Sequence, residues 1–172
     1  MIVVTLPCHA MTTQEQKSLV DEIKQSCIKF NTECQVAVIP TKQYKAYSDN
    51  HSNLKISQGL LDNFTKEEVR SAAFHELSHL SLEHPTFWKK YTDKNNLVVV
   101  PVTITKPIRH MHEYQADSYA SHLLYISGYP NKLDEVLMKL VPEQARNIET
   151  NTHPSINNRI RNIQRIKNYY EL

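Results

Sequence analysis

Two histidines and a glutamate in the run HELSH form the clearest chemical pattern in this sequence. His75 and His79 lie four residues apart, and Glu76 directly follows the first. In a helix, residues four apart rise from one face, so both imidazoles can bind one tetrahedral zinc ion. Such an ion lowers the pKa of a bound water to about 7, and Glu76 can take that water's proton and pass it to a leaving amine. The spacing therefore predicts hydrolysis of peptide bonds.

A hydrolytic zinc site needs a third protein ligand and an open fourth position. Glu113, the first residue of the run EYQAD, is the third ligand that we expect. Asp117 lies one turn further along the same helical face, where it could hydrogen-bond the free nitrogen of a ligand histidine and fix the orientation of that ring.

His84, in HELSHLSLEH, is the competing third ligand. The metzincin pattern requires Gly three residues and His six residues after the second histidine of the motif, but Leu82 and Pro85 occupy those positions. We therefore interpret His84 as an ordinary residue at the end of the helix. His110 and His112 flank Glu113 but point in other helical directions, so we interpret them as neighbours of the ligands or as surface residues.

Two helices must position these residues. Thr65 and Glu68 form a capping box that predicts the start of the helix carrying HELSH, and a helix over residues 107–127 should carry EYQAD. Further helices are expected over residues 13–30 and 132–140 and from residue 154 onward, and strands over residues 2–6, 35–39 and 54–61. The apolar segment 97–105 is interpreted as an edge strand or a flap.

Composition indicates a globular protein. Its 172 residues fit one domain, expected to span residues 1–172, and the apolar fraction of 40% and charged fraction of 22% are near the globular average. The net charge is only +2, and we find no basic stripe interleaved with aromatic residues, so we expect no nucleic-acid partner. The sequence does not indicate an oligomeric state.

The expected location is cytoplasmic or otherwise intracellular. No window reaches the roughly 18 apolar residues that span a bilayer, and the N-terminus lacks the basic lead and apolar core of a signal peptide, so we expect no membrane association. The three cysteines, Cys8, Cys27 and Cys34, are odd in number and lack metal-type spacing, so we expect reduced thiols.

Three parts of the sequence resemble one known family. They are ISQGLLDNFTKEEVRSAAFHELSHL, which contains the motif helix, HEYQAD, and THPSINNRI. In order and spacing they are similar to the gluzincin metallopeptidases of the HtpX and CaaX-prenyl-protease type, including the small soluble minigluzincins. The resemblance implies an α+β zincin domain, in which a small, mainly N-terminal sheet packs on the active-site helix and further helices.

The resemblance also implies a role for each site residue. It implies zinc (Zn²⁺) bound by His75, His79 and Glu113, with Glu76 as general base and acid and Asp117 as a partner of a ligand histidine. It adds His153 as a donor to the oxyanion and Arg159 as a residue that orients or stabilises it. The strand containing Ile56, Ser57, Gln58 and Gly59 would form the rim of the cleft and pair with an extended substrate.

The function that we expect is that of a soluble zinc metalloendopeptidase acting on proteins or peptides. The absence of transmembrane segments argues against a membrane-embedded or prenylated substrate. One alternative is a latent, zymogen-like member of the family, and another is a noncatalytic interaction module with structural zinc. Glu76 argues against the second alternative, because a structural site has no need of a base beside its ligand.

Overall fold

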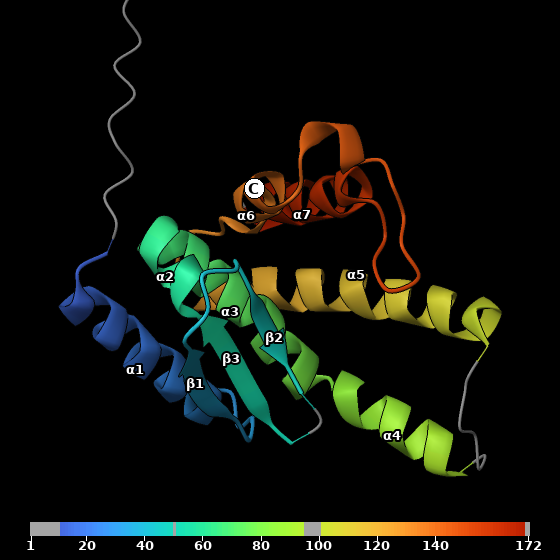
Figure 1. Cartoon of the computed structure of the whole chain (residues 1–172), viewed down its shortest axis with the longest axis horizontal. Coiled ribbons are helices and arrows are strands. Elements are labelled where there is room, and N and C mark those ends of the chain that lie inside the picture. Colours follow the sequence, from blue (N-terminus) through green and yellow to red (C-terminus); the bar gives the residue numbers. More distant parts are fainter. Residues whose placement is uncertain (1–10, 50, 95–100, 171–172) are drawn as a thin grey trace, which may run out of the picture.

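The structure is a computed structural model that describes residues 11–49, 51–94 and 101–170. Seven α-helices, one 3-10 turn and a three-stranded sheet are described over these ranges (Figure 1). In chain order they are α1 (Thr13–Lys29), β1 (Gln35–Ile39), β2 (Ala46–Ser48), β3 (Asn53–Ser57), α2 (Gln58–Asn63), α3 (Lys66–Ser81), α4 (His84–Lys94), α5 (Val102–Ile126), α6 (Leu133–Leu140), η1 (Glu143–Ala145) and α7 (Ile156–Tyr170). The mixed, mostly helical architecture confirms the expected α+β class. The strand expected at residues 2–6 lies outside the described residues.

Helix α3, which carries HELSH, occupies the centre of the fold. The sheet and α1 lie on one side of it, and α5, α6 and α7 lie on the other (Figure 1). Its start is the predicted capping box: Thr65 Oγ1 accepts from the Glu68 backbone N–H, and the Glu68 carboxylate accepts from the Thr65 N–H at 2.9 Å. Val69, Phe74 and Leu77 of α3 are fully buried. The motif helix is therefore held by packing on both sides.

The sheet has the strand order β1-β3-β2, with β1 parallel and β2 antiparallel to the central β3. Leu54 and Ile56 of β3 are buried in the core, together with residues of α1, α3, α5, α6 and α7. The strand expected over residues 54–61 is wrong in its second half, because Ser57 caps a short helix there by accepting from the Leu60 N–H at 3.1 Å. Strand β2 lies in a segment for which the sequence indicated no helix or strand.

Proline positions account for two further corrections. Helix α4, which the sequence did not indicate, begins at His84, so Pro85 lies in its first turn, where the missing N–H costs no intrahelical bond. Helix α5 begins at Val102, with Pro101 as its cap and Pro107 inside it. The described part of the segment 97–105 is therefore helical and not an edge strand. Residues 97–100 lie outside the described residues.

Cys27 and Cys34 form a disulfide, with their Cα atoms 6.0 Å apart. The expectation of three reduced thiols is therefore wrong for these two. Asn31 adopts a positive φ of 50° just after α1, and the Thr32 N–H donates to the Cys27 carbonyl at 2.9 Å. This reversal brings the start of β1 back beside the last turn of α1. Within the described ranges, every helix is too short or too polar to cross a bilayer.

Candidate metal centre

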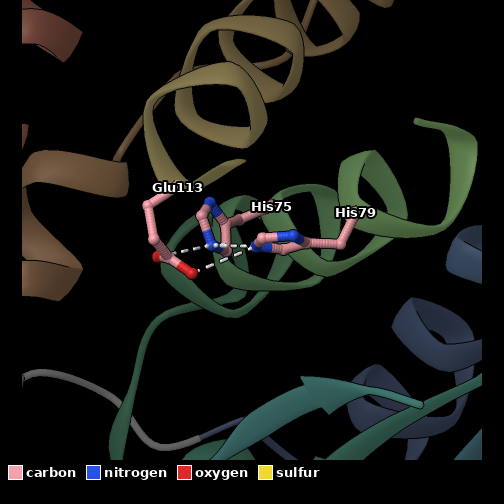
Figure 2. A group of neighbouring side chains, drawn as sticks. All are labelled: His75, His79 and Glu113. Atoms are coloured by element: carbon pink, nitrogen blue, oxygen red, sulfur yellow. Dashed lines mark hydrogen bonds and ion pairs between the residues drawn. The ribbon is translucent and has the colours of Figure 1, made fainter. Parts of the chain in front are cut away.

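The two motif histidines and Glu113 meet between α3 and α5. His75 Nε2 and His79 Nε2 lie 3.1 Å apart, and the Glu113 carboxylate oxygens lie 3.5 Å from His75 Nε2 and 3.4 Å from His79 Nε2 (Figure 2). One donor atom from each of these three residues lies within 4.8 Å of the others. The structure thus brings together the three ligands expected from the sequence.

The chemistry of this group fits a metal cation such as zinc. Two imidazole nitrogens and a carboxylate are a usual ligand set for a catalytic zinc. Glu113 Oε2 is also the one buried side-chain polar atom, among the described residues, without a hydrogen-bond partner. Arg159 Nη1 lies 2.8 Å from it as an ion pair, but without hydrogen-bond alignment. A bound cation would satisfy this oxygen.

Asp117 contacts the ring nitrogen of His75 that faces away from His79 and Glu113. Its Oδ1 lies 3.0 Å from His75 Nδ1, so an N–H there can donate to the carboxylate and leave Nε2 as the ligand atom. Arg159, at the start of α7, binds the same carboxylate through Nε at 2.9 Å and Nη2 at 2.6 Å. Asp117 and Arg159 are both buried. The guanidinium therefore faces Asp117 and Glu113, a geometry that favours orienting the ligand residues.

The charges of the site are coupled. Burial raises the pKa of Glu113, but the close polar contacts with His75 and His79 and the charge of Arg159 outweigh it and hold that pKa well below its usual range. The pKa of Asp117 is lowered in the same way, with Arg159 outweighing burial. Burial lowers the pKa of His75, but the close contacts with the carboxylates of Asp117 and Glu113 outweigh it and raise this pKa to about 10. Both carboxylates are thus ionised at neutral pH, as cation binding requires, whereas a bound cation would displace the second ring proton of His75.

The motif glutamate is held by a residue that we did not single out from the sequence. Ser48, at the end of β2, donates to Glu76 Oε2 from its backbone N–H at 2.8 Å and from its Oγ at 3.0 Å. Ser48 is separated from Glu76 by 28 residues in sequence, so no local pattern links the two. Their contact exists only because α3 packs against β2.

His153 approaches the site from the loop ahead of α7, not from the helix itself. Its Nε2 lies 3.8 Å from Glu113 Oε1, and its Nδ1 lies 2.7 Å from Thr152 Oγ1. The side chain is about half exposed, at 52%. His153 therefore reaches the ligand group from the solvent side, whereas Arg159 reaches it from the buried side.

His84 is not an ordinary residue at a helix end. It is only 6% exposed, and its Nδ1 lies 2.9 Å from His79 Nδ1. The ring of His112 stacks on it at 4.0 Å between centroids. Burial, followed by the nearby His112 and His79, lowers the pKa of His84 to about 3. His112 accordingly neighbours the ligands, whereas His110 contacts the Thr150 carbonyl at 2.9 Å.

A cleft of about 550 Å³ lies in front of these residues. Its lining includes all of β2, the motif residues, Glu113, His153, Arg159 and apolar side chains of α6, among them Leu133, Val136, Leu137 and Leu140. The cleft is therefore polar near the ligand group and apolar along α6.

The residues of the expected substrate strand do not lie at the cleft. Ile56 and Ser57 are fully buried in β3, whose two sides pair with β1 and β2. Gln58 and Gly59 are helical; Gln58 hydrogen-bonds Gln16 of α1 at 3.0 Å, and a Cβ at Gly59 would collide with the Lys42 carbonyl. None of the four is among the described residues that line the cleft. The strand that borders it is β2.

Comparison with known families agrees with the C-terminal part of this site. The sequence model of peptidase family M48 matches residues 91–167, less than half of the chain. The match includes Glu113, Asp117, His153 and Arg159 but not α3 with its HELSH motif. No curated protein matches the chain significantly. Over residues 91–167 the chain is therefore similar to peptidase family M48, which agrees with the resemblance expected from the sequence and implies a metallopeptidase.

Proposed function

We propose that this protein is a zinc-dependent endopeptidase with Glu76 as its general base. The observation that carries the proposal is the convergence of His75, His79 and Glu113 in the lining of a cleft. The motif glutamate lines the same cleft. The family match supports a metallopeptidase, and a metallopeptidase acts on proteins or peptides.

Each side chain of the site would have its own role in peptide hydrolysis. His75, His79 and Glu113 would hold the zinc, which when bound would polarise the scissile carbonyl and activate a water molecule. Glu76 would accept a proton as the water oxygen bonds to the carbonyl carbon. It would then deliver that proton to the amide nitrogen as the C–N bond breaks. His153, on the solvent side of the cleft, would donate to the developing oxyanion.

We propose β2 as the strand that aligns the substrate. β2 pairs with β3 on one side and borders the cleft with Ala46, Tyr47 and Ser48. An extended peptide could add to the other side of β2 through the main-chain groups that face away from β3, other than the Ser48 N–H that is bonded to Glu76. The apolar wall of α6 would then accept an apolar substrate side chain. Flexible segments of proteins meet these requirements, because they can adopt an extended strand.

Metal dependence tests this proposal. The wild-type protein should bind one zinc ion per chain and cleave an unstructured protein such as casein, and chelation should abolish cleavage until zinc is restored. Glu113→Gln should weaken both zinc binding and cleavage. Glu143→Gln changes an exposed glutamate of η1 in the same way and should affect neither. Equal cleavage by zinc-loaded and zinc-free protein would overturn the proposal.

A further inference from the structure

His84 connects the ligand His79 to Gln115 of α5. Its Nδ1 lies 2.9 Å from His79 Nδ1, and its Nε2 lies 3.1 Å from Gln115 Oε1. His79 belongs to α3, His84 is the first residue of α4, and Gln115 belongs to α5. They form a continuous path of hydrogen bonds that leads from the ligand group through the buried His84 to the exposed Gln115.

The hydrogen positions along this path follow from its chemistry. An amide oxygen can only accept, so His84 Nε2 must carry the hydrogen that it shares with Gln115 Oε1. A neutral His84 then has its lone pair on Nδ1, which must accept from the N–H at His79 Nδ1. The lone pair of His79 is thereby placed on Nε2, the atom 3.4 Å from Glu113 Oε1 and 3.1 Å from His75 Nε2. The path thus selects the tautomer that can bind a metal.

The surroundings of His84 keep its ring in place. The His112 ring lies parallel to it, with an angle of 3° between the planes. Glu83, directly before His84, adopts a positive φ of 55° and separates α3 from α4. This sharp change of direction places the first residue of α4 back against the last turns of α3. The stacked His112 ring and the turn at Glu83 therefore hold the His84 ring in place.

We propose that His84 and Gln115 are positioning residues, which set the tautomer and orientation of His79 as a metal ligand. The inference rests on the proposed zinc site. It gives the two ligand histidines different supports: a charged acceptor, Asp117, for His75 and a neutral acceptor, His84, for His79. Outer partners of ligand histidines typically contribute about 10- to 100-fold to metal affinity.

Two variants of similar size separate this role from simple packing. His84→Asn places an amide oxygen near the position of Nδ1, whereas His84→Leu fills a similar volume without an acceptor. Both lose the imidazole ring and its stacking on His112. Zinc affinity should be measured by competition with a chromophoric chelator, and the visible spectrum of the cobalt-loaded protein should be recorded as a report on ligand geometry. Gln115→Leu provides a third variant that leaves His84 itself unchanged.

We expect His84→Leu to lower zinc affinity by about 10- to 100-fold and to change the cobalt spectrum. His84→Asn should retain most of the affinity, and Gln115→Leu should show a smaller loss. Equal affinities of the Asn and Leu variants, whether both normal or both weakened, would overturn the positioning role while leaving the zinc site intact. Failure of the wild-type protein to bind zinc would overturn the proposed function and this inference together.

Discussion

The general base of the proposed site, Glu76, is oriented by Ser48. Both donors of Ser48, its N–H and its hydroxyl, point at Glu76 Oε2. Hydrogen bonds to an ionised group are shorter and stronger than those between neutral groups. This contact fixes one oxygen of the carboxylate, so we expect the other oxygen, Oε1, to face the attacking water.

Removal of the Ser48 hydroxyl tests this orientation. Ser48→Ala keeps the backbone donor but loses one hydrogen bond to the carboxylate, so we expect the kcat for casein-derived peptides to fall by about 10-fold. Zinc affinity should not change, because Ser48 contacts none of the three proposed metal ligands. The matched control is Ser118→Ala, whose hydroxyl donates to the Tyr114 carbonyl within α5. A wild-type kcat in Ser48→Ala would show that the backbone donor alone suffices.

At the scale of elements, α7 ties α5 to α3 through one buried guanidinium. Arg159 contacts Asp117 and Glu113 of α5, and its Nη2 lies 3.4 Å from His75 Nε2 of α3. All four side chains are buried. Removal of the Arg159 guanidinium would leave the buried carboxylates of Asp117 and Glu113 with less compensating charge. Burying such uncompensated charges destabilises the folded state.

Arg159→Leu should therefore destabilise the metal-free protein by about 3–5 kcal/mol. The measurement is denaturant unfolding monitored by circular dichroism, without zinc. Arg165→Leu removes an exposed arginine of the same helix and should have little effect. If the two variants unfolded at the same denaturant concentration, Arg159 would not be the electrostatic link between these helices.

At the scale of the whole molecule, elements with strong local signals were predictable from sequence. The capping box at Thr65 and the apolar run of β1 fixed their elements, and both are confirmed. The strand expected over residues 54–61 failed because Ser57 can cap a helix as readily as it can continue a strand. The three-residue strand β2 has too few residues for an alternating pattern, so only its pairing with β3 defines it.

The same distinction applies to the site. His75, His79 and Glu113 were predictable because regular helical spacing defines their directions. Ser48 and His84 could not be predicted from the sequence. The contact of Ser48 depends on how β2 packs on α3, and that of His84 depends on the turn before α4. Family resemblance, not spacing, pointed to Arg159, and the structure places it against the ligands' buried side.

Metal removal tests how far the site contributes to the whole fold. Zinc would bind ligands from α3 and α5 that lie together only in the folded chain, so it should stabilise that state. At free zinc about 100 times the dissociation constant, the expected gain is about 2.7 kcal/mol. Thermal unfolding of zinc-loaded and chelated protein, at one protein concentration, checks this. Glu113→Gln should show a smaller zinc-dependent shift, and an identical melting temperature with and without zinc in the wild type would contradict the prediction.

The central claim, a metallopeptidase whose base is Glu76, is tested most directly by Glu76→Gln. This variant keeps His75, His79 and Glu113 but replaces the carboxylate that takes up the proton. We expect zinc-loaded wild type to cleave casein and zinc-loaded Glu76→Gln to bind zinc equally well but cleave about 10²- to 10⁴-fold more slowly. Equal cleavage by the two proteins would show that Glu76 is not the base, and failure of the wild type to cleave would contradict the peptidase assignment itself.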